Sequence, residues 1–215
     1  MSLARAAVCL GILVSMNLGC AALQPKGAVP VSPEREAVAE VLLPVSALRG
    51  DLILQQTVTI RWRDREKSFD AVLQKRGDEL LLLGLGPMNS VGFTLTLDDL
   101  GVRLENRSGR EMPFEPERIL ADVQRVFYPW IAAEEPCTQC ERHAARAGLD
   151  ISERIGPEYL EERRFEDSSA RGRGEIVVRY EEWMDGGSIP GRAVLNNGWY
   201  GYELTVVTRS VERLE

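Results

Sequence analysis

Polar and apolar residues alternate along the chain after residue 50, and this two-residue period constrains the fold more than any other feature. Leu52, Leu54, Val58, Ile60 and Trp62 occupy one face of an extended segment, and polar residues lie between them. Only Gln56 interrupts the apolar face with a polar side chain. Because successive side chains of a β-strand point to opposite faces, the pattern predicts a strand with one buried face.

Similar short segments follow at close intervals. We expect further strands at about 67–76, 79–84, 91–97, 102–104, 151–155, 159–166, 175–183, 193–195 and 200–208. Segment 79–84 is nearly all leucine, which predicts a strand covered on both faces. Gly77-Asp78 and Ser108-Gly109 predict turns. Short connections between consecutive strands favour a meandering antiparallel sheet.

Between residues 116 and 130 the period becomes helical. The apolar stripe consists of Ile119, Leu120, Val123, Val126, Phe127 and Trp130. Pro116 suits a first helical turn and Pro129 marks the end of the helix. A second, shorter helix is predicted at 138–147, stopped by Gly148. The order of strands, helices and strands predicts a mainly β, α+β fold. In this fold a curved, incomplete antiparallel barrel surrounds central helices that act as a plug or lid.

We expect the charged and polar side chains outside the apolar faces to be exposed to solvent. Asp122 and Gln124 lie beside the helical stripe, where they could cap a ligand head group, although exposure on the opposite face is the interpretation that we favour. Glu161-Glu162 and Arg163-Arg164 are interpreted as solvated runs, since charged residues are seldom fully buried.

The amino terminus has the layout of a secretory signal, predicted over residues 1–19. Arg5 precedes a short apolar run at 6–14, which is too short for a bilayer that needs about 20 apolar residues. Gly19-Cys20 resembles the lipobox of bacterial lipoproteins, although Asn17 stands where that motif usually has leucine. The resemblance implies that Cys20 is lipidated. The alternative is an ordinary secreted protein.

The residues after Cys20 predict a tether and a single domain. Segment 20–33 contains three prolines and a glycine, which suits a flexible lipidated tether, and one domain is expected over 34–215. Ala21 points to the outer membrane, because in enteric bacteria an aspartate there favours the inner membrane. The net charge of −7 argues against nucleic acid as a partner and against adsorption to anionic lipid heads. Anchoring is therefore expected from acyl chains alone, at the periplasmic face of the outer membrane.

Two cysteines and the lone histidine lie close together in the sequence. Cys137 and Cys140 are interpreted as a structural disulfide formed in an oxidising envelope. A redox centre would need the motif at a helix start after a strand, whereas the preceding predicted element is a helix. A zinc site with His143 would lack a fourth ligand within the mature chain, apart from Cys20. We therefore expect no metal and no cofactor.

Enzyme signatures are not found. The sequence has no G-x-S-x-G elbow, no phosphate loop and no H-E-x-x-H motif. Any catalytic triad would depend on His143 alone, and no nucleophile elbow accompanies it. The protein is therefore not expected to be an enzyme, and a thiol oxidoreductase is the one enzymatic alternative.

Segment 79–114, from Glu-Leu-Leu-Leu-Leu-Gly-Leu-Gly-Pro-Met-Asn onward, resembles LolB, the outer-membrane lipoprotein receptor of the LolA-LolB type. Segment 114–130, with Ile-Leu-Ala-Asp-Val-Gln and Tyr-Pro-Trp, is similar to LolB-like lipoproteins of unassigned function. These are encoded beside fatty-acid-type or aryl-polyene synthesis genes. The resemblance covers most of residues 48–208. It implies a half-barrel whose cavity takes acyl chains, and a soluble LolA-like carrier as partner.

The resemblance also implies site residues. A protruding turn at Pro87 and Met88 would correspond to the membrane-inserting loop of LolB. The face assignments then predict a cavity lined by Leu54, Val58, Ile60, Phe69, Leu82, Phe93, Leu95, Leu120, Val123 and Phe127. The expected function is acceptance or transfer of a lipid or lipoprotein at the outer membrane. The alternative is an accessory envelope lipoprotein with a packed core that acts through protein contacts.

Overall fold

The computed structural model describes residues 40–109, 112, 114–132, 137–169 and 174–214. The predicted signal 1–19, the tether 20–33 and Cys20 lie outside these residues. Within the described part of the chain, no helix is long and apolar enough to cross a membrane.

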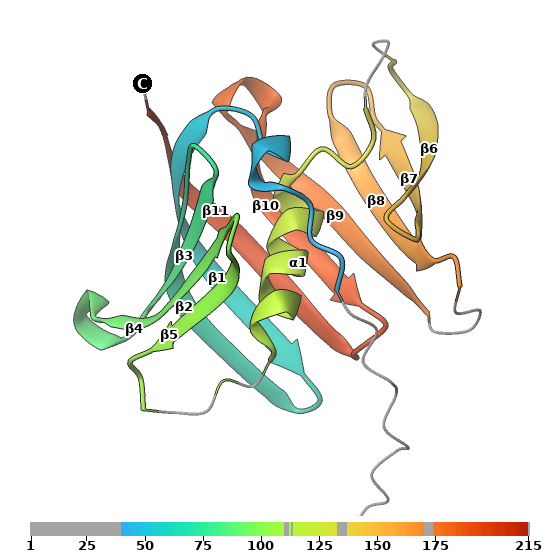
Figure 1. Ribbon diagram of the computed structural model, residues 1–215. Helices are drawn as coiled ribbons and strands as arrows, with labels where there is room; N and C mark the ends of the chain where they lie inside the picture. Colours follow the sequence, from blue (N-terminus) through green and yellow to red (C-terminus); the bar gives the residue numbers. More distant parts are fainter. Residues whose placement is uncertain (1–39, 110–111, 113, 133–136, 170–173, 215) are drawn as a thin grey trace, which may run out of the picture. The chain divides into compact units, whose positions relative to one another are not determined.

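The described residues form one antiparallel sheet and one α-helix (Figure 1). The first meander comprises β1 Asp51–Trp62, β2 Arg65–Arg76, β3 Glu79–Leu85, β4 Val91–Asp98 and β5 Gly101–Asn106. The helix α1 spans Pro116–Phe127. The second meander comprises β6 Cys140–Arg146, β7 Leu149–Ile155, β8 Leu160–Asp167, β9 Glu175–Met184, β10 Ile189–Asn197 and β11 Tyr202–Leu214. Short 3₁₀ turns are η1 Val45–Ala47, η2 Pro87–Asn89 and η3 Asp185–Gly187.

The two meanders meet where the first strand pairs with the last. The strand order is β5-β4-β3-β2-β1-β11-β10-β9-β8-β7-β6, so β5 and β6 are the two edges and the sheet does not close into a barrel. Figure 1 shows the sheet curving around α1, which lies across its concave face. The mainly β, open-barrel prediction with a helical plug is therefore confirmed, with a single α-helix among the described residues.

The second predicted helix, at 138–147, is wrong. Residues 140–146 form β6, which pairs with β7 from Cys140↔Ile155 to Arg146↔Leu149. Ala147 and Gly148 both have positive φ angles, of 56° and 76°. Two such residues make the tight turn that matches the twist of a hairpin, so Gly148 turns the chain back instead of ending a helix.

The prediction that β3 is covered on both faces is also wrong. Leu80 and Leu82 are buried, whereas Leu81 and Leu83 on the other face are half-buried. The concave side is covered by α1 and by the segment around η1, while the convex side of β3 carries no second layer among the described elements.

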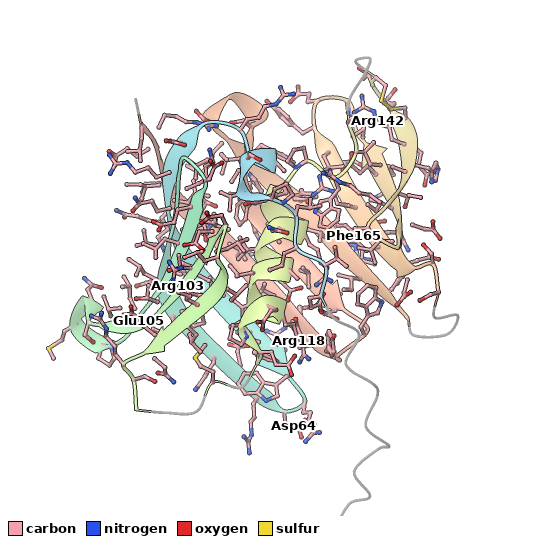
Figure 2. All side chains as sticks on the ribbon, viewed as in Figure 1. Asp64, Arg103, Glu105, Arg118, Arg142 and Phe165 are labelled. Atoms are coloured by element: carbon pink, nitrogen blue, oxygen red, sulfur yellow. A yellow bond between two sulfur atoms is a disulfide. The ribbon has the colours of Figure 1, made fainter. Side chains whose placement is uncertain are left out.

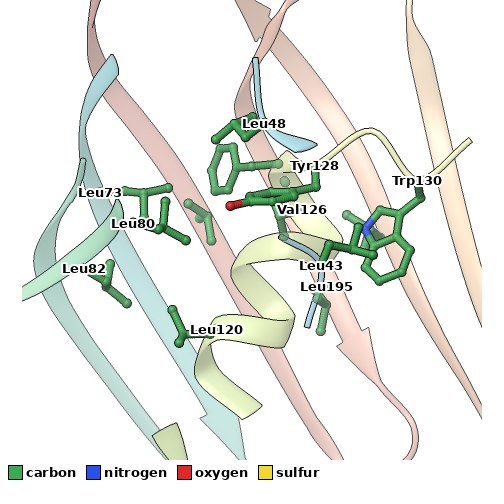
Figure 3. Packing of buried hydrophobic residues seen from close by; sticks show 14 of the residues in the cluster. Leu43, Leu48, Leu73, Leu80, Leu82, Leu120, Val126, Tyr128, Trp130 and Leu195 are labelled. Carbon is green, nitrogen blue, oxygen red and sulfur yellow. The ribbon is translucent and has the colours of Figure 1, made fainter. Parts of the chain in front are cut away.

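The packed core fills the part of the concave face nearest η1 (Figure 3). Register places Leu54 beside Leu73, Leu73 beside Leu82, and Leu82 beside Leu95 across four strands. These four residues, which we call the leucine row, are all buried. Leu48 and Tyr128 lie over the same region in Figure 3. A second part of the core contains Trp130 and Phe165, whose rings pack edge to face at 5.0 Å.

Candidate functional site: an apolar cavity beside the helix

A cavity of about 780 Å³ lies between the first meander, β11 and α1. Seven of the predicted lining residues line it: Val58, Ile60, Phe69, Leu82, Phe93, Val123 and Phe127. The other three, Leu54, Leu95 and Leu120, do not line it and are fully buried in packed core. The residues predicted to face inward do face inward in the structure. The sequence pattern did not show where along each strand the packed core ends and the cavity begins.

The boundary between packed core and cavity follows a change in residue size across the sheet. In the row next to the leucine row, Gln56 lies beside Ala71, Ala71 beside Gly84, and Gly84 beside Phe93. Ala71 and Gly84 carry almost no side chain, so this row, which we call the small-residue row, holds much less side-chain volume than the leucine row. The Phe93 ring lies over Gly84 and meets the Phe69 ring at 6.1 Å.

Aromatic residues stand at the opposite end of the cavity, which we call the mouth. Trp62 and Tyr202 are the last residues paired between β1 and β11. The Phe114 ring lies 6.3 Å from that of Trp62 and 5.0 Å from that of Tyr202. Arg118, in the first turns of α1, lies 3.6 Å from the centre of the Tyr200 ring. Figure 2 labels Arg118 and Asp64, in the β1–β2 turn, at the same end of the view.

Asp122 places a polar side chain on the wall of the cavity that α1 forms. It is buried and accepts hydrogen bonds from the Tyr202 hydroxyl, from Arg125 Nη1 at 2.8 Å and from Asn197 Nδ2 at 3.4 Å. Burial raises the pKa of the Asp122 carboxyl, and Arg125 opposes this rise. Burial, and next the charge of Asp122, raises the pKa of Tyr202. The predicted exposure of Asp122 is wrong, because Arg125 and Tyr202 supply partners that make burial tolerable.

Gln124 is also buried, contrary to the prediction, and it holds the chain segment that precedes β1. Its Oε1 accepts from the Leu43 N–H at 2.7 Å, and its Nε2 donates to the Leu43 carbonyl at 2.8 Å. The helix therefore faces the cavity with its apolar stripe and binds backbone with a polar side chain on another face. A period of apolar residues could not reveal this second buried face.

Two charged residues predicted as solvated lie inside the second meander. Arg163 is buried and donates to Glu153 Oε1 at 2.7 Å and to the Arg125 carbonyl at 2.8 Å, which fixes the end of α1 to β8. Glu162 is buried as well and accepts from Arg164 Nε at 2.9 Å and Arg179 Nε at 3.1 Å. The solvated interpretation is wrong for both, because each finds an opposite charge on a neighbouring strand.

The predicted membrane loop is η2, between β3 and β4. Pro87 lines the cavity, and the next residue, Met88, has 99% of its surface exposed. Met88 has a φ angle of 58°, a left-handed conformation that turns its side chain away from the strands. Pro87 and Met88 thus place a cavity wall and a fully exposed apolar side chain on adjacent residues.

Cys137 and Cys140 are joined by a disulfide, as the sequence predicts. Arg142 Nε donates to Cys137 Sγ at 3.0 Å. Cys140 begins an edge strand and not a helix, so the geometry expected of a thioredoxin-like redox centre is not what surrounds this pair. His143 is largely exposed, and its nearest acidic partner, Glu141, lies 3.8 Å away. Among the described residues, no group of three or more metal-ligating side chains forms.

Gln56 is one of the cavity residues that the predicted list omitted. It was visible in the sequence as the one polar residue on the apolar face of its strand. Ala71, Gly84 and Gly92 also line the cavity, but a small residue in a strand gives no sign of whether a neighbour fills the space beside it.

Solved structures with a similar course of the chain have low sequence identity to it. A LolA superfamily protein from Nitrosomonas europaea is 12% identical, with a TM-score of 0.46, covering 81% of this chain and 95% of its own. A Vibrio parahaemolyticus domain, provisionally named an outer membrane lipoprotein-sorting protein, is 13% identical, with a TM-score of 0.39, covering 77% and 87%. A DUF1329 family protein from Desulfovibrio piger is 13% identical, with a TM-score of 0.40, covering 79% and 87%.

Sequence comparison gives the family. Among curated proteins none matches the chain. Residues 53–210, which run from β1 to β11 and include every strand that lines the cavity, match the family described as protein of unknown function (DUF3261). The chain belongs to the DUF3261 family.

Proposed function

We infer that this protein binds acyl chains in the cavity and accepts or transfers a lipid or lipoprotein. The observation that carries the proposal is the cavity itself, with its volume of about 780 Å³ and mainly apolar wall. Ligand pockets have volumes of about 300–1,000 Å³ and predominantly apolar linings. Protein interiors otherwise pack as densely as organic crystals, so space of this size beside a filled core is a feature to be explained. The activity is binding and transfer without covalent chemistry.

The site of action in this proposal is the periplasmic face of the outer membrane. The lipobox-like Gly19-Cys20 supports a lipid anchor, and the acidic net charge leaves the acyl chains as the means of attachment. The resemblance to LolB and to LolB-like lipoproteins supports a soluble LolA-like carrier as the delivering partner. Nucleic acid has no role in this proposal.

Met88 is the element proposed to enter the bilayer. Its side chain is apolar and flexible, and in the free protein it is exposed to water, which is unfavourable for an apolar group. Insertion into a membrane would remove this contact with water. Because the neighbouring Pro87 lines the cavity, an inserted Met88 would bring the cavity wall to the membrane surface.

The test of ligand binding is native mass spectrometry of the full chain purified from the cell envelope, followed by denaturation and lipid analysis. We expect a non-covalent amphiphile that leaves on denaturation, whereas the lipid on Cys20 stays. Val206→Phe places a ring in the cavity and should lower the bound amphiphile several-fold. Val207→Phe, the next residue and on the opposite face of β11, is the matched control.

Two results would contradict the proposal. One is a folded wild-type protein without bound amphiphile that also takes up no fluorescent fatty acid. The other is equal amphiphile content in the Val206→Phe and Val207→Phe variants. Either result would favour an accessory envelope lipoprotein that acts through protein contacts.

The role of Met88 is tested by the rate at which fluorescent fatty acid moves from the full chain to lipid vesicles. Met88→Ala should slow transfer several-fold and leave the amount of bound fatty acid unchanged. Leu100→Ala is the matched control, because Leu100 is also exposed (82%) but lies in the β4–β5 turn and does not line the cavity. Equal slowing by both substitutions would mean that general surface hydrophobicity, and not this turn, assists transfer.

A further inference from the structure

Gln56 is a polar side chain in the wall of an apolar cavity, at the end remote from the mouth. Only 4% of its surface is exposed, and its Nε2 has no hydrogen-bond partner among the described residues. Buried side-chain donors are nearly always paired, so an unpaired amide on a residue of the cavity wall needs an explanation.

The neighbours of Gln56 do not provide an acceptor. Ala71, opposite it on β2, has no polar side-chain atom. Thr208, opposite it on β11, donates its hydroxyl to the Pro190 carbonyl at 2.8 Å, and its oxygen does not accept a hydrogen bond from Gln56 Nε2. Ala71 and Gly84, the next residues of the small-residue row, line the cavity beside Gln56. The register of β1 with β11 shifts between Gln55 and Gln56, and such bulges re-aim side chains next to functional sites.

The position of Gln56 determines which part of a bound acyl chain can reach its side chain. At the rise of a β-strand, the distance along β1 from Trp62 at the mouth to Gln56 is about 20 Å. A ligand with its head group at the mouth therefore reaches Gln56 only with the distal part of a long chain. Lys67, one of the cationic residues lining the cavity, lies opposite Ile60 and thus nearer the mouth.

We propose that Gln56 donates a hydrogen bond to a neutral oxygen, a hydroxyl or carbonyl, carried on the distal part of the bound acyl chain. This inference rests on the proposed binding of acyl chains. A carboxylate is a poor match for this depth, because a buried charge needs an opposite charge and the amide supplies none. The cavity thus selects oxygenated chains over plain hydrocarbon chains of equal length.

The experiment uses the full chain and displacement of a fluorescent fatty acid. The competitors are palmitic acid and a series of hydroxypalmitic and oxopalmitic acids that differ in the position of the oxygen. Affinity should peak for oxygen in the distal half of the chain, by about tenfold over palmitic acid, as one hydrogen bond made in place of an unpaired donor would give.

Substitutions then assign the peak to its residue. Gln56→Leu should remove the preference while palmitic acid binds as well as before or better. Gln55→Leu, the same change on the exposed neighbour, should keep the preference. If Gln56→Leu fails to fold, Gln56→Met serves as the second variant, and the positional series on the wild-type chain stands without either.

The outcomes separate the two proposals. If no fatty acid displaces the probe, or the probe itself does not bind, the proposed function fails. If palmitic acid binds and no oxygen position is preferred, only the role of Gln56 fails, and water is then the partner of its amide. If the preference for an oxygen in the distal half of the chain persists in Gln56→Leu, this role is also overturned, because another residue must then bind the oxygen.

Discussion

Gly84 and Phe93 show how a single residue determines the shape of the cavity wall. The two residues face each other in the β3–β4 register, and the Phe93 ring lies where a side chain at position 84 would be. A Cβ built on Gly84 would come within 1.9 Å of Phe93 Cε1. The ring can therefore lie along the wall, in contact with Phe69, only because position 84 has no side chain.

Gly84→Ala should lower the free energy of unfolding by about 1–3 kcal/mol, because overpacking forces the ring off its position. Chemical denaturation measures this loss. In a Phe93→Leu background the same substitution should cost clearly less, since the clashing ring is gone. An equal cost in both backgrounds would show that the backbone at position 84, and not the ring, requires glycine.

At the scale of the element, α1 is held by charged and polar contacts as well as by apolar packing. Arg125 is buried and donates to Asp122 at 2.8 Å and to Glu40 at 2.6 Å, while Asp122 accepts from Tyr202 on β11. These bonds join the helix to the last strand and to the segment before β1. They also place a buried carboxyl, with a pKa raised by burial, next to the cavity.

The raised pKa of Asp122 predicts a specific pH dependence. The folded state holds the Asp122 proton to higher pH than the unfolded state, whose carboxyl titrates near its usual value of about 4. Wild-type stability, relative to Asp122→Asn, should therefore fall as pH rises above about 4 and through the raised pKa. Denaturant unfolding of both proteins between acid and neutral pH measures the difference. A difference that is flat, or that grows in favour of the wild type, would show that Arg125 outweighs burial.

At the scale of the whole molecule, the first and last strands join two meanders that are each built from neighbouring hairpins. β1 has 12 residues, and its register with β11 runs from Asp51↔Leu214 to Trp62↔Tyr202. The helix reinforces this junction, because Arg163 of the second meander bonds its last turn while its apolar stripe faces the first. Pairing of segments so distant in sequence is slow to form and couples the meanders.

We therefore expect one cooperative unfolding transition for residues 40–214. Hydrogen exchange followed by mass spectrometry at increasing denaturant should show β3–β4 and β7–β8 losing protection together. Tryptophan fluorescence and circular dichroism should give the same midpoint. Two separated transitions would show that the meanders fold independently and that the β1–β11 junction is weak.

The strand pattern could be predicted from local sequence, but two kinds of feature could not. The segment 140–146 is strand because Ala147 and Gly148 turn the chain back onto β7, and a glycine after a polar, alanine-containing run looks the same at a helix end. Asp122, Gln124 and Arg163 are buried because their partners come from distant segments. Arg125, three residues after Asp122, is a local partner, but Tyr202 and Leu43 lie far away in the sequence and Glu153 lies on another strand.

By itself, the sequence determined the mainly β class, the inward face of β1, the position of α1 and the pairing of Cys137 with Cys140. Each follows from the chain's own periodicity or from residues close in sequence. Only the tertiary structure decided which inward residues line a cavity and which fill a core. That division depends on cross-strand rows: Leu54, Leu73, Leu82 and Leu95 form one buried row, of which only Leu82 also lines the cavity. Gln56, Ala71 and Gly84 meet in the next row and line the cavity, because the register determines which side-chain volumes lie beside each other across the sheet.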